Sequence, residues 1–386
     1  MICCPVCDGK DVFPFLSRDD VPVHQNLLCE SEASARAVNT GRLQMTVCAT
    51  CSFVFNAAFD LSRLSYGEGY NNCQTHSPYF EAYVRDLTRG LVEESGVRNA
   101  LIVEVGCGNG DFLRGLVNYP DSGNRGIGFD PAYNGAATEL NGKLRFVKEY
   151  YGPEHASLAA DVVVSRHVIE HVPQPIPLLQ SLAKALSGSS QAKVFFETPN
   201  VDWILSNQVV WDFFYEHCSL FNVRSIAYAF ERASFSPKEA KLVFGEQYLW
   251  FEAALNGTKT SPAAGADTVA LAQAFGRNYE ANMKRAKQTL EALARKGKVA
   301  LWGAGAKGTT FASIIDADKT LIDCLIDLNP DKQSKYVPGT GHAIVSPKEI
   351  GVRGVKHAIL MNPNYAAECR ALLAGMKSDC ELVMWS

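Results

Sequence analysis

The 386-residue sequence has no apolar run that approaches the roughly 18 residues of a membrane-spanning helix. Its first ten residues, MICCPVCDGK, lack the apolar core of a signal peptide. No basic block stands out, and 37 Lys and Arg against 41 Asp and Glu leave a net charge of −4, which disfavours nucleic acid as a partner. These absences predict a cytoplasmic protein that binds neither membranes nor nucleic acid.

The composition is that of an ordinary globular chain, with 47% hydrophobic and 20% charged residues. At roughly 150 residues per domain, the length predicts two or three domains. Residues 1–60 show little periodicity, whereas short apolar strands alternate with helices in 61–256 and again in 257–386, after a long amphipathic helix. We predict an α/β protein with a small N-terminal module, a Rossmann-like core and a second Rossmann-like domain.

Four of the twelve cysteines form two matching pairs. Cys4 and Cys7 make one C-x-x-C pair and Cys48 and Cys51 make another, so four thiolates can converge on one metal ion. Because nothing indicates secretion, metal binding or free buried thiols are expected rather than disulfides. We predict a structural zinc site, since four thiolates leave no open position for catalysis. Cys3 leaves the register of the first pair open.

A glycine-rich turn follows the first strand of the central part. Glu104 lies near the end of that strand, and Gly106, Gly108 and Gly110 let the backbone approach a ligand closely. This G-x-G-x-G spacing differs from the G-x-G-x-x-G of a dinucleotide fold. Asp130 ends the next strand, where a carboxylate can bind both hydroxyls of a ribose. The turn and Asp130 resemble the cofactor motif of class I S-adenosylmethionine-dependent methyltransferases, which predicts that cofactor.

Later strands of the same sheet supply further candidates for the cofactor site. Tyr150 and Tyr151 follow the third strand, and they either flank the adenine ring or are ordinary core aromatics. Ser165 and Arg166 end the fourth strand, where we expect them to line the methionine end of the cofactor.

Tyr215, Glu216 and His217 stand consecutively after a predicted strand. A histidine can take up a proton near neutral pH, and an adjacent carboxylate can orient it. A single histidine is more often structural, but such a run beside a cofactor site predicts catalysis. His171 is a second candidate, with a structural role at a helix start as its alternative.

A second glycine-rich turn opens the C-terminal part. Gly303, Gly305 and Gly308 have the G-x-G-x-x-G spacing between a strand and a helix, and Asp327 ends the next strand. Lys307 adds a positive charge that suits a phosphate. The turn therefore indicates NAD, another phosphorylated ligand, or packing alone.

The order of these elements resembles the sugar C-methyltransferase family, which combines an N-terminal zinc-binding module, a methyltransferase core and a C-terminal Rossmann-like domain. The resemblance rests on the stretches Cys4–Cys7, Cys48–Cys51, Glu104–Gly110, Tyr215–Phe221, Gly303–Thr310 and Asp327–Thr340. It implies methylation of carbon 3 of a nucleotide-linked 4-keto-deoxy sugar. The implied domains are 1–60 for zinc, 61–256 for methyl transfer and 257–386 for the substrate.

The family resemblance also implies roles for individual residues. The implied catalytic residues are Tyr215, Glu216, His217, His171 and Tyr70, with Tyr66 as the alternative to Tyr70. The C-terminal domain is implied to enclose the nucleotide-sugar rather than to bind NAD, with Gly305, Lys307 and Tyr336 at the substrate.

One segment departs from the family pattern. The sugar enzymes carry a His-Gly-Gly-Ser-Leu-Arg-like stretch where this sequence reads Phe-Gly-Glu-Gln-Tyr-Leu-Trp-Phe at 244–251. We predict C-methylation alpha to a ketone, with His217 as the base and Glu216 orienting it. The alternatives are O- or N-methylation on the same scaffold, and an NAD-binding protein that works through the C-terminal turn.

Overall fold

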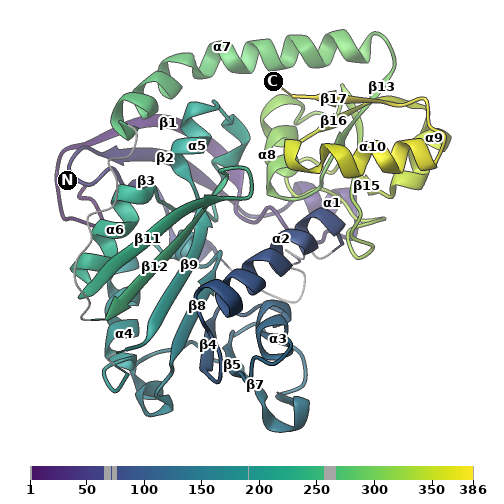
Figure 1. The fold of residues 1–386 in the computed structure, drawn as a ribbon. Coiled ribbons are helices and arrows are strands. Elements are labelled where there is room, and N and C mark those ends of the chain that lie inside the picture. Colours follow the sequence, from purple (N-terminus) through teal and green to yellow (C-terminus); the bar gives the residue numbers. More distant parts are fainter. Residues whose placement is uncertain (1, 65–70, 72–75, 190, 256–266, 386) are drawn as a thin grey trace.

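The computed structural model describes residues 2–64, 71, 76–189, 191–255 and 267–385. Within these ranges the chain forms a four-stranded, an eight-stranded and a five-stranded sheet (Figure 1). Across the same ranges, no helix combines the length and the apolar character needed to cross a membrane.

The N-terminal sheet is antiparallel, and one of its strands comes from the central part of the chain. Its strands are, in spatial order, β1 (Val12–Pro22), β2 (Thr40–Cys48), β3 (Val54–Asn56) and β10 (Ser219–Leu220), and helix α1 (Glu32–Arg36) lies between β1 and β2 in the sequence. In β10, Ser219 pairs with Phe55 and Leu220 with Val54. This pairing holds the Tyr-Glu-His segment, which directly precedes β10, against the N-terminal module.

The central sheet has the strand order of a doubly wound Rossmann-like fold. Its spatial order is β11 (Phe235–Val243), β12 (Tyr248–Leu255), β9 (Lys193–Pro199), β8 (Val162–Arg166), β4 (Leu101–Val105), β5 (Arg125–Phe129), β7 (Leu144–Val147) and β6 (Thr138–Glu139). Strand β4 pairs in parallel with both β5 and β8, which makes its carboxyl end a topological switch point. Ligands bind at such a point in open α/β sheets.

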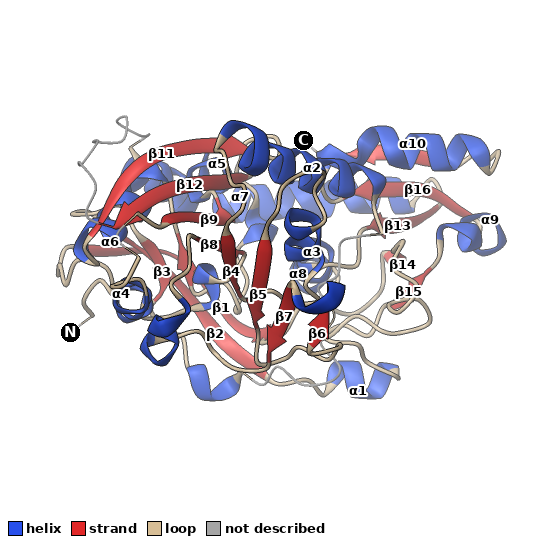
Figure 2. Ribbon diagram, turned by 60° about the horizontal axis from the view of Figure 1, so that its bottom comes forward, coloured by secondary structure: helices blue, strands red, loops and turns tan. Residues whose placement is uncertain are grey.

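Helices cover both faces of the central sheet (Figure 2). One face packs on α4 (Pro175–Ala185) and α6 (Val223–Arg232), and the other on α2 (Pro78–Arg89) and α3 (Asp111–Val117). Side chains alternate between the two faces along each strand. In strand β4, Val103 packs in the core with α4 and α6, and Ile102 packs in the core with α2 and α3. Helix α5 (Val201–Ser206) follows β9.

The C-terminal sheet is entirely parallel. Its order is β15 (Ala343–Val345), β14 (Ile322–Ile326), β13 (Lys298–Trp302), β16 (Val355–Leu360) and β17 (Glu381–Met384). Helix α8 (Ala306–Ile315) packs on one face, and α9 (Ile350–Arg353) and α10 (Ala366–Gly375) on the other. Its switch point lies at the end of β13, where the second glycine-rich turn begins.

Helix α7 (Thr268–Ala294) joins the C-terminal sheet to the N-terminal module (Figure 1). Its apolar stripe is buried at Phe275, Ala286 and Leu290, in agreement with the predicted long amphipathic helix. The Phe275 ring lies 6.0 Å from Phe15 of β1 and 5.1 Å from Phe213 of the central part. One apolar core therefore fixes the three parts of the chain relative to one another.

The predicted fold class is confirmed, because two Rossmann-like sheets follow a small module that contains a cysteine cluster. The domain boundaries stay a prediction: β10 shows that residues 219–220 complete the N-terminal sheet, and residue 257 lies outside the described ranges.

Gly308 tests how tightly α8 packs on the second glycine turn. A Cβ at this position would lie 1.9 Å from the Gly303 carbonyl oxygen, whereas a Cβ at Gly351 meets nothing within 4 Å. We expect Gly308→Ala to destabilise the fold by about 1–3 kcal/mol through overpacking, and Gly351→Ala to be neutral or slightly stabilising. Thermal unfolding measures both, and equal melting temperatures for the two variants would contradict the packing argument.

Candidate active site

A cavity of about 250 Å³ lies where all three parts of the chain meet. The N-terminal module contributes Asn26, the central part His167 and His217, and the C-terminal domain Gly305, Asp327 and Asn362. His167, Gly305, Asp327 and Asn362 follow parallel strands, which deliver their carboxyl ends to one edge of a sheet, whereas His217 lies on the segment that leads into β10. The cavity thus joins the carboxyl edges of two Rossmann-like sheets.

Two histidines and a carboxylate meet in the cavity wall. Glu170, His171 and His217 each place one polar atom within 4.8 Å of the others. The His171 and His217 rings lie 4.8 Å apart, edge to face, and Phe214 packs 4.1 Å from His217. Burial, with the positive charges of His171, His167 and Lys307, holds the pKa of His217 well below its usual range. His217 is therefore neutral at pH 7 and able to accept a proton.

The neighbours of His217 in the Tyr-Glu-His run point elsewhere. Glu216 Oε1 lies 2.7 Å from Nδ1 of His24, a residue of the N-terminal module, and both side chains are buried. Glu216 lines the cavity. The Tyr215 hydroxyl accepts a hydrogen bond from the Asp60 amide at 2.8 Å, and its ring packs against Gly41, where a Cβ would come within 2.3 Å.

The catalytic role of Tyr215 stays a prediction. Among the described residues that line the cavity, Phe214 and His217 appear but Tyr215 does not. Its backbone contact with Asp60 and its fit against Gly41 give it a structural position between the module and the core. Tyr66 and Tyr70 lie outside the described residues.

His167 sits at the end of β8 within a buried network of charges. Its Nδ1 lies 3.1 Å from Glu170 Oε1, and its Nε2 lies 3.7 Å from Glu197 Oε1. Glu197 also pairs with Arg166 and accepts a hydrogen bond from the Tyr83 hydroxyl. Burial lowers the pKa of His167, but the two carboxylates outweigh it and raise the pKa to about 9. His167 is therefore positively charged at pH 7.

The first glycine turn fits the predicted cofactor. A Cβ at Gly106 would lie 2.2 Å from Val168, so the turn packs directly on the residue after His167, whereas a Cβ at Gly108 would meet nothing within 4 Å. The Glu104 carboxyl is buried, and its Oε2 has no hydrogen-bond partner within the part of the chain that the structure describes. Burial raises the pKa of Glu104 to about 8. An open backbone turn beside an unsatisfied buried carboxyl oxygen suits a polar ligand such as S-adenosylmethionine.

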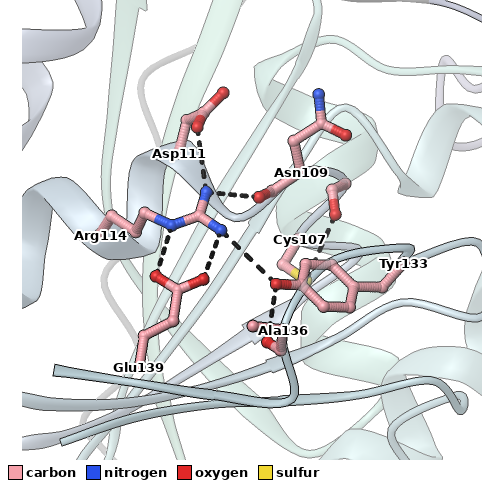
Figure 3. Close-up of polar contacts among 8 residues, drawn as sticks. Cys107, Asn109, Asp111, Arg114, Tyr133, Ala136 and Glu139 are labelled. Atoms are coloured by element: carbon pink, nitrogen blue, oxygen red, sulfur yellow. Dashed lines mark hydrogen bonds and ion pairs between the residues drawn. The ribbon is translucent and has the colours of Figure 1, made fainter. Parts of the chain in front are cut away.

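Arg114 of α3 holds this turn in place (Figure 3). Its guanidinium binds both oxygens of Glu139 at 2.9 Å and donates to the Asn109 carbonyl oxygen at 2.6 Å. The guanidinium also donates a hydrogen bond to Asp111 Oδ1 at 3.1 Å. Such a bidentate pair is geometrically specific, so it fixes the backbone around Gly108 and Gly110.

Three other predicted cofactor residues occupy different surroundings. Asp130 accepts hydrogen bonds from the amides of Gly108 at 2.9 Å and Ala132 at 2.8 Å, which ties the ribose position to the glycine turn. Ser165 is buried and donates to the Val105 carbonyl oxygen at 3.0 Å. Tyr150 is 78% exposed, whereas Tyr151 is buried against Phe129.

The second glycine turn faces the cavity with Gly303, Gly305 and Lys307. Asp327 accepts a hydrogen bond from the Ala304 amide at 2.9 Å, the same arrangement that Asp130 has in the first turn. Lys307 forms an ion pair with Asp212 of the central part. Tyr336 is not among the described residues of the cavity wall, and its backbone pairs with Cys29 and Ala343, so its place at the substrate stays a prediction.

The four predicted zinc ligands lie together. The Sγ atoms of Cys4 and Cys51 are 3.6 Å apart and those of Cys7 and Cys48 are 3.4 Å apart, with all four sulfurs within 4.8 Å of one another. Sulfurs bound 2.3 Å from one zinc ion at tetrahedral angles lie about 3.8 Å apart. The cluster therefore fits a tetrahedral metal. Cys3 is exposed and lies outside it.

Sequence reasoning missed several cavity residues. His167 and Glu170 had a signal, because polar residues directly after a parallel strand face the binding edge. Asp212, also in the cavity wall, had none, since its partner Lys307 is far away in the sequence. The same holds for His24, which is not among the described wall residues but contacts Glu216.

Known proteins match the chain over both Rossmann-like parts. A family model described as a methyltransferase domain matches residues 79–239, and a model described as a C-methyltransferase C-terminal domain matches residues 256–384. The C-methyltransferase NovU of Streptomyces niveus is 25% identical, and the match covers 95% of this chain and 90% of NovU.

Solved structures match the central part with low scores. The 1,6-didemethyltoxoflavin-N1-methyltransferase of Burkholderia thailandensis, with bound S-adenosylhomocysteine, has a TM-score of 0.36 at 15% identity over 47% of this chain and 88% of that chain. CalO1, a methyltransferase of calicheamicin biosynthesis with S-adenosylhomocysteine bound, has a TM-score of 0.37 at 14% identity over 46% of this chain and 55% of that chain.

The raised pKa of His167 gives a prediction for pH. Because this pKa is about 9 in the folded chain against an ordinary 6.5, the protonated ring stabilises the fold. That stabilisation is complete below about pH 6.5 and is lost as the pH rises through about 9. Proton NMR of the histidine rings should show one titration midpoint near 9 that is missing in His167→Asn. A midpoint near the ordinary value would contradict the charge network.

Proposed function

We propose that this chain, which belongs to the S-adenosylmethionine-dependent C-methyltransferases, methylates a carbon alpha to the ketone of a nucleotide-linked deoxy-keto-sugar, with His217 as the base. The observation that carries the proposal is the cavity that joins two Rossmann-like carboxyl edges and holds a neutral histidine. One edge carries the cofactor turn and the other a glycine turn with a lysine that suits a phosphate. The resemblance to the C-methyltransferase NovU over most of both chains supports methylation of carbon.

The cofactor site is proposed on the first glycine turn. Glu104, Gly106, Gly108, Gly110 and Asp130 are the residues that would hold S-adenosylmethionine, with Ser165 behind them. When bound, this cofactor supplies an electrophilic methyl group. The packing of Gly106 on Val168 brings the turn next to the cavity wall that carries His167.

His217 is proposed to create the nucleophile. A carbon beside a ketone becomes nucleophilic when it loses a proton, and a neutral imidazole can take that proton. Its pKa is depressed in part by Lys307, so a diphosphate bound beside this lysine would offset the positive charge and raise the pKa of His217 toward the working range. Substrate binding would thus make His217 a stronger base.

The remaining predicted residues take supporting places in this proposal. His171, edge to face with His217, limits the orientation of the base. Glu216 lies on the cavity wall and contacts His24, and we propose that it acts on the substrate side. Gly305 and Lys307 face the nucleotide side.

The four clustered cysteines are proposed to bind one structural zinc ion. Their sulfur separations of 3.4 and 3.6 Å support this, as does the Gly9 amide, which donates to Cys7 Sγ at 3.4 Å. Backbone hydrogen bonds to a thiolate are the outer contacts expected around such an ion. The ion would fix the N-terminal module, which supplies Asn26 to the cavity and the His24 partner of Glu216.

Replacement of His217 tests the base. We expect His217→Gln to lower methyl transfer to thymidine diphosphate-linked keto-sugars by about 10²–10⁴-fold, because general base catalysis typically contributes that much. His357→Asn, a histidine outside the cavity, should leave the rate unchanged. The measurement is methyl transfer from labelled S-adenosylmethionine, with carbon NMR of the product. A fully active His217→Gln would exclude His217 as the base.

Metal analysis tests the zinc site. We expect one zinc ion per chain, lost in Cys48→Ser together with thermal stability, because a structural zinc ion contributes folding free energy. Cys3→Ser is the matched control, since Cys3 is exposed and outside the cluster. Retention of zinc in Cys48→Ser, or its loss in Cys3→Ser, would show that the assigned ligand set is wrong.

A further inference from the structure

We propose that His167 is a catalytic residue that donates a hydrogen bond to the ketone oxygen of the acceptor while His217 removes the neighbouring proton. This role rests on the proposed ketone substrate. It concerns the opposite end of the reacting group from the base, and none of the motifs in the sequence pointed to it.

His167 is built into the cavity wall with Nδ1 held by Glu170, and with Nε2 in a longer ion pair with Glu197 but without a hydrogen bond. Nδ1 contacts Glu170 at 3.1 Å, which fixes the ring plane. Nε2 is buried and has no hydrogen-bond partner among the described residues, although Glu197 lies 3.7 Å away. A buried polar atom without a hydrogen bond costs free energy unless a ligand supplies the partner. A ketone oxygen in the cavity would satisfy it.

The backbone at His167 is strained in a way that serves this position. Its φ of 53° is in the left-handed region, which a residue with a side chain seldom adopts. Such strained conformations cluster at functional sites. Here the left-handed residue turns the chain from β8 into the 3₁₀ turn Ile169–His171, so that both His167 and His171 line the cavity.

The two histidines have opposite charge states because their surroundings differ. Carboxylates face His167 from two elements, Glu170 on the 3₁₀ turn and Glu197 on β9, and they outweigh the positive charge of Arg166 on β8. Within the described residues, two phenols also face this network, Tyr248 on β12, whose ring lies 4.5 Å away, and Tyr83 on α2, which binds Glu197. His217 interacts with His167 through charge repulsion. His217 instead faces positive groups, and its pKa is lowered. Two titratable groups pushed apart in this way indicate one acid and one base.

Glu170 sets the distance between the imidazole rings of His167 and His217. It contacts His167 directly, and one of its oxygens lies within 4.8 Å of the polar atoms of His171 and His217. In the proposed step, the C–H bond alpha to the ketone breaks and its proton goes to His217. The electron pair forms the enolate double bond, and the carbonyl π pair moves to the oxygen. The charged ring of His167 then faces the negative oxygen without transferring its own proton.

Exchange of the alpha proton for deuterium isolates this step from methyl transfer. The full-length protein is incubated in D2O with S-adenosylhomocysteine and thymidine diphosphate 4-keto-6-deoxyglucose, and NMR follows the loss of the proton at carbon 3. We expect His167→Asn to slow exchange by about 10²–10³-fold, the usual effect of removing one oxyanion donor. The affinity of His167→Asn for S-adenosylhomocysteine, measured by calorimetry, should stay unchanged. The control His357→Asn should keep both the wild-type exchange rate and the wild-type affinity.

A cationic replacement separates a catalytic role from a structural one. His167→Lys restores a positive charge with an ordinary pKa of about 10.4. We expect it to recover part of the exchange and to move the alkaline fall of the rate to higher pH than in the wild type. Exchange at the wild-type rate in His167→Asn overturns the proposal, and so does a His167→Lys variant that recovers nothing. Absence of exchange in the wild type would instead refute the ketone substrate, and the role of His167 with it.

Discussion

The structure depends on one constraint, that parallel strands deliver all their carboxyl ends to one edge of a sheet. The chain contains two such sheets, and the core shared by β1, α7 and the C-terminal sheet turns their edges toward the same cavity. Each edge carries a glycine turn whose amide is bound by an aspartate at the end of the next strand. A cofactor at one turn and a phosphorylated acceptor at the other would therefore meet in the middle.

The N-terminal module completes this arrangement rather than standing apart from it. Strand β10 joins its sheet, the Tyr215 ring packs on Gly41, and His24 binds Glu216. Any change that loosens the module should therefore reach the cavity through the segment that carries His217. A metal ion on the four cysteines would act at a distance, by keeping this segment in register.

Charge, more than shape, distinguishes the histidines of the cavity. His167 and His217 are both partly buried, yet carboxylates around the first raise its pKa, whereas burial and nearby positive groups lower the pKa of the second. Arg166 pairs with Glu197, one of the two carboxylates next to His167. The opposite pKa shifts thus come from partners that belong to other elements of the fold.

Local spacing carried most of the correct predictions. Four features depend on residues that are close in the sequence and can therefore be read from one sequence. They are the alternation of strands and helices, the two glycine turns, the C-x-x-C pairs and the apolar stripe of α7. The fold class and the cofactor followed from them. Pairings across long separations had no such signal: His24 with Glu216, Asp212 with Lys307, and the turning of Tyr215 toward Asp60 instead of the cavity. Adjacency in sequence placed Tyr215, Glu216 and His217 together, but packing against three different partners separated their side chains. Which histidine carries a charge depends on carboxylates brought together only by the folded sheet, and for that reason it belongs to the tertiary structure alone.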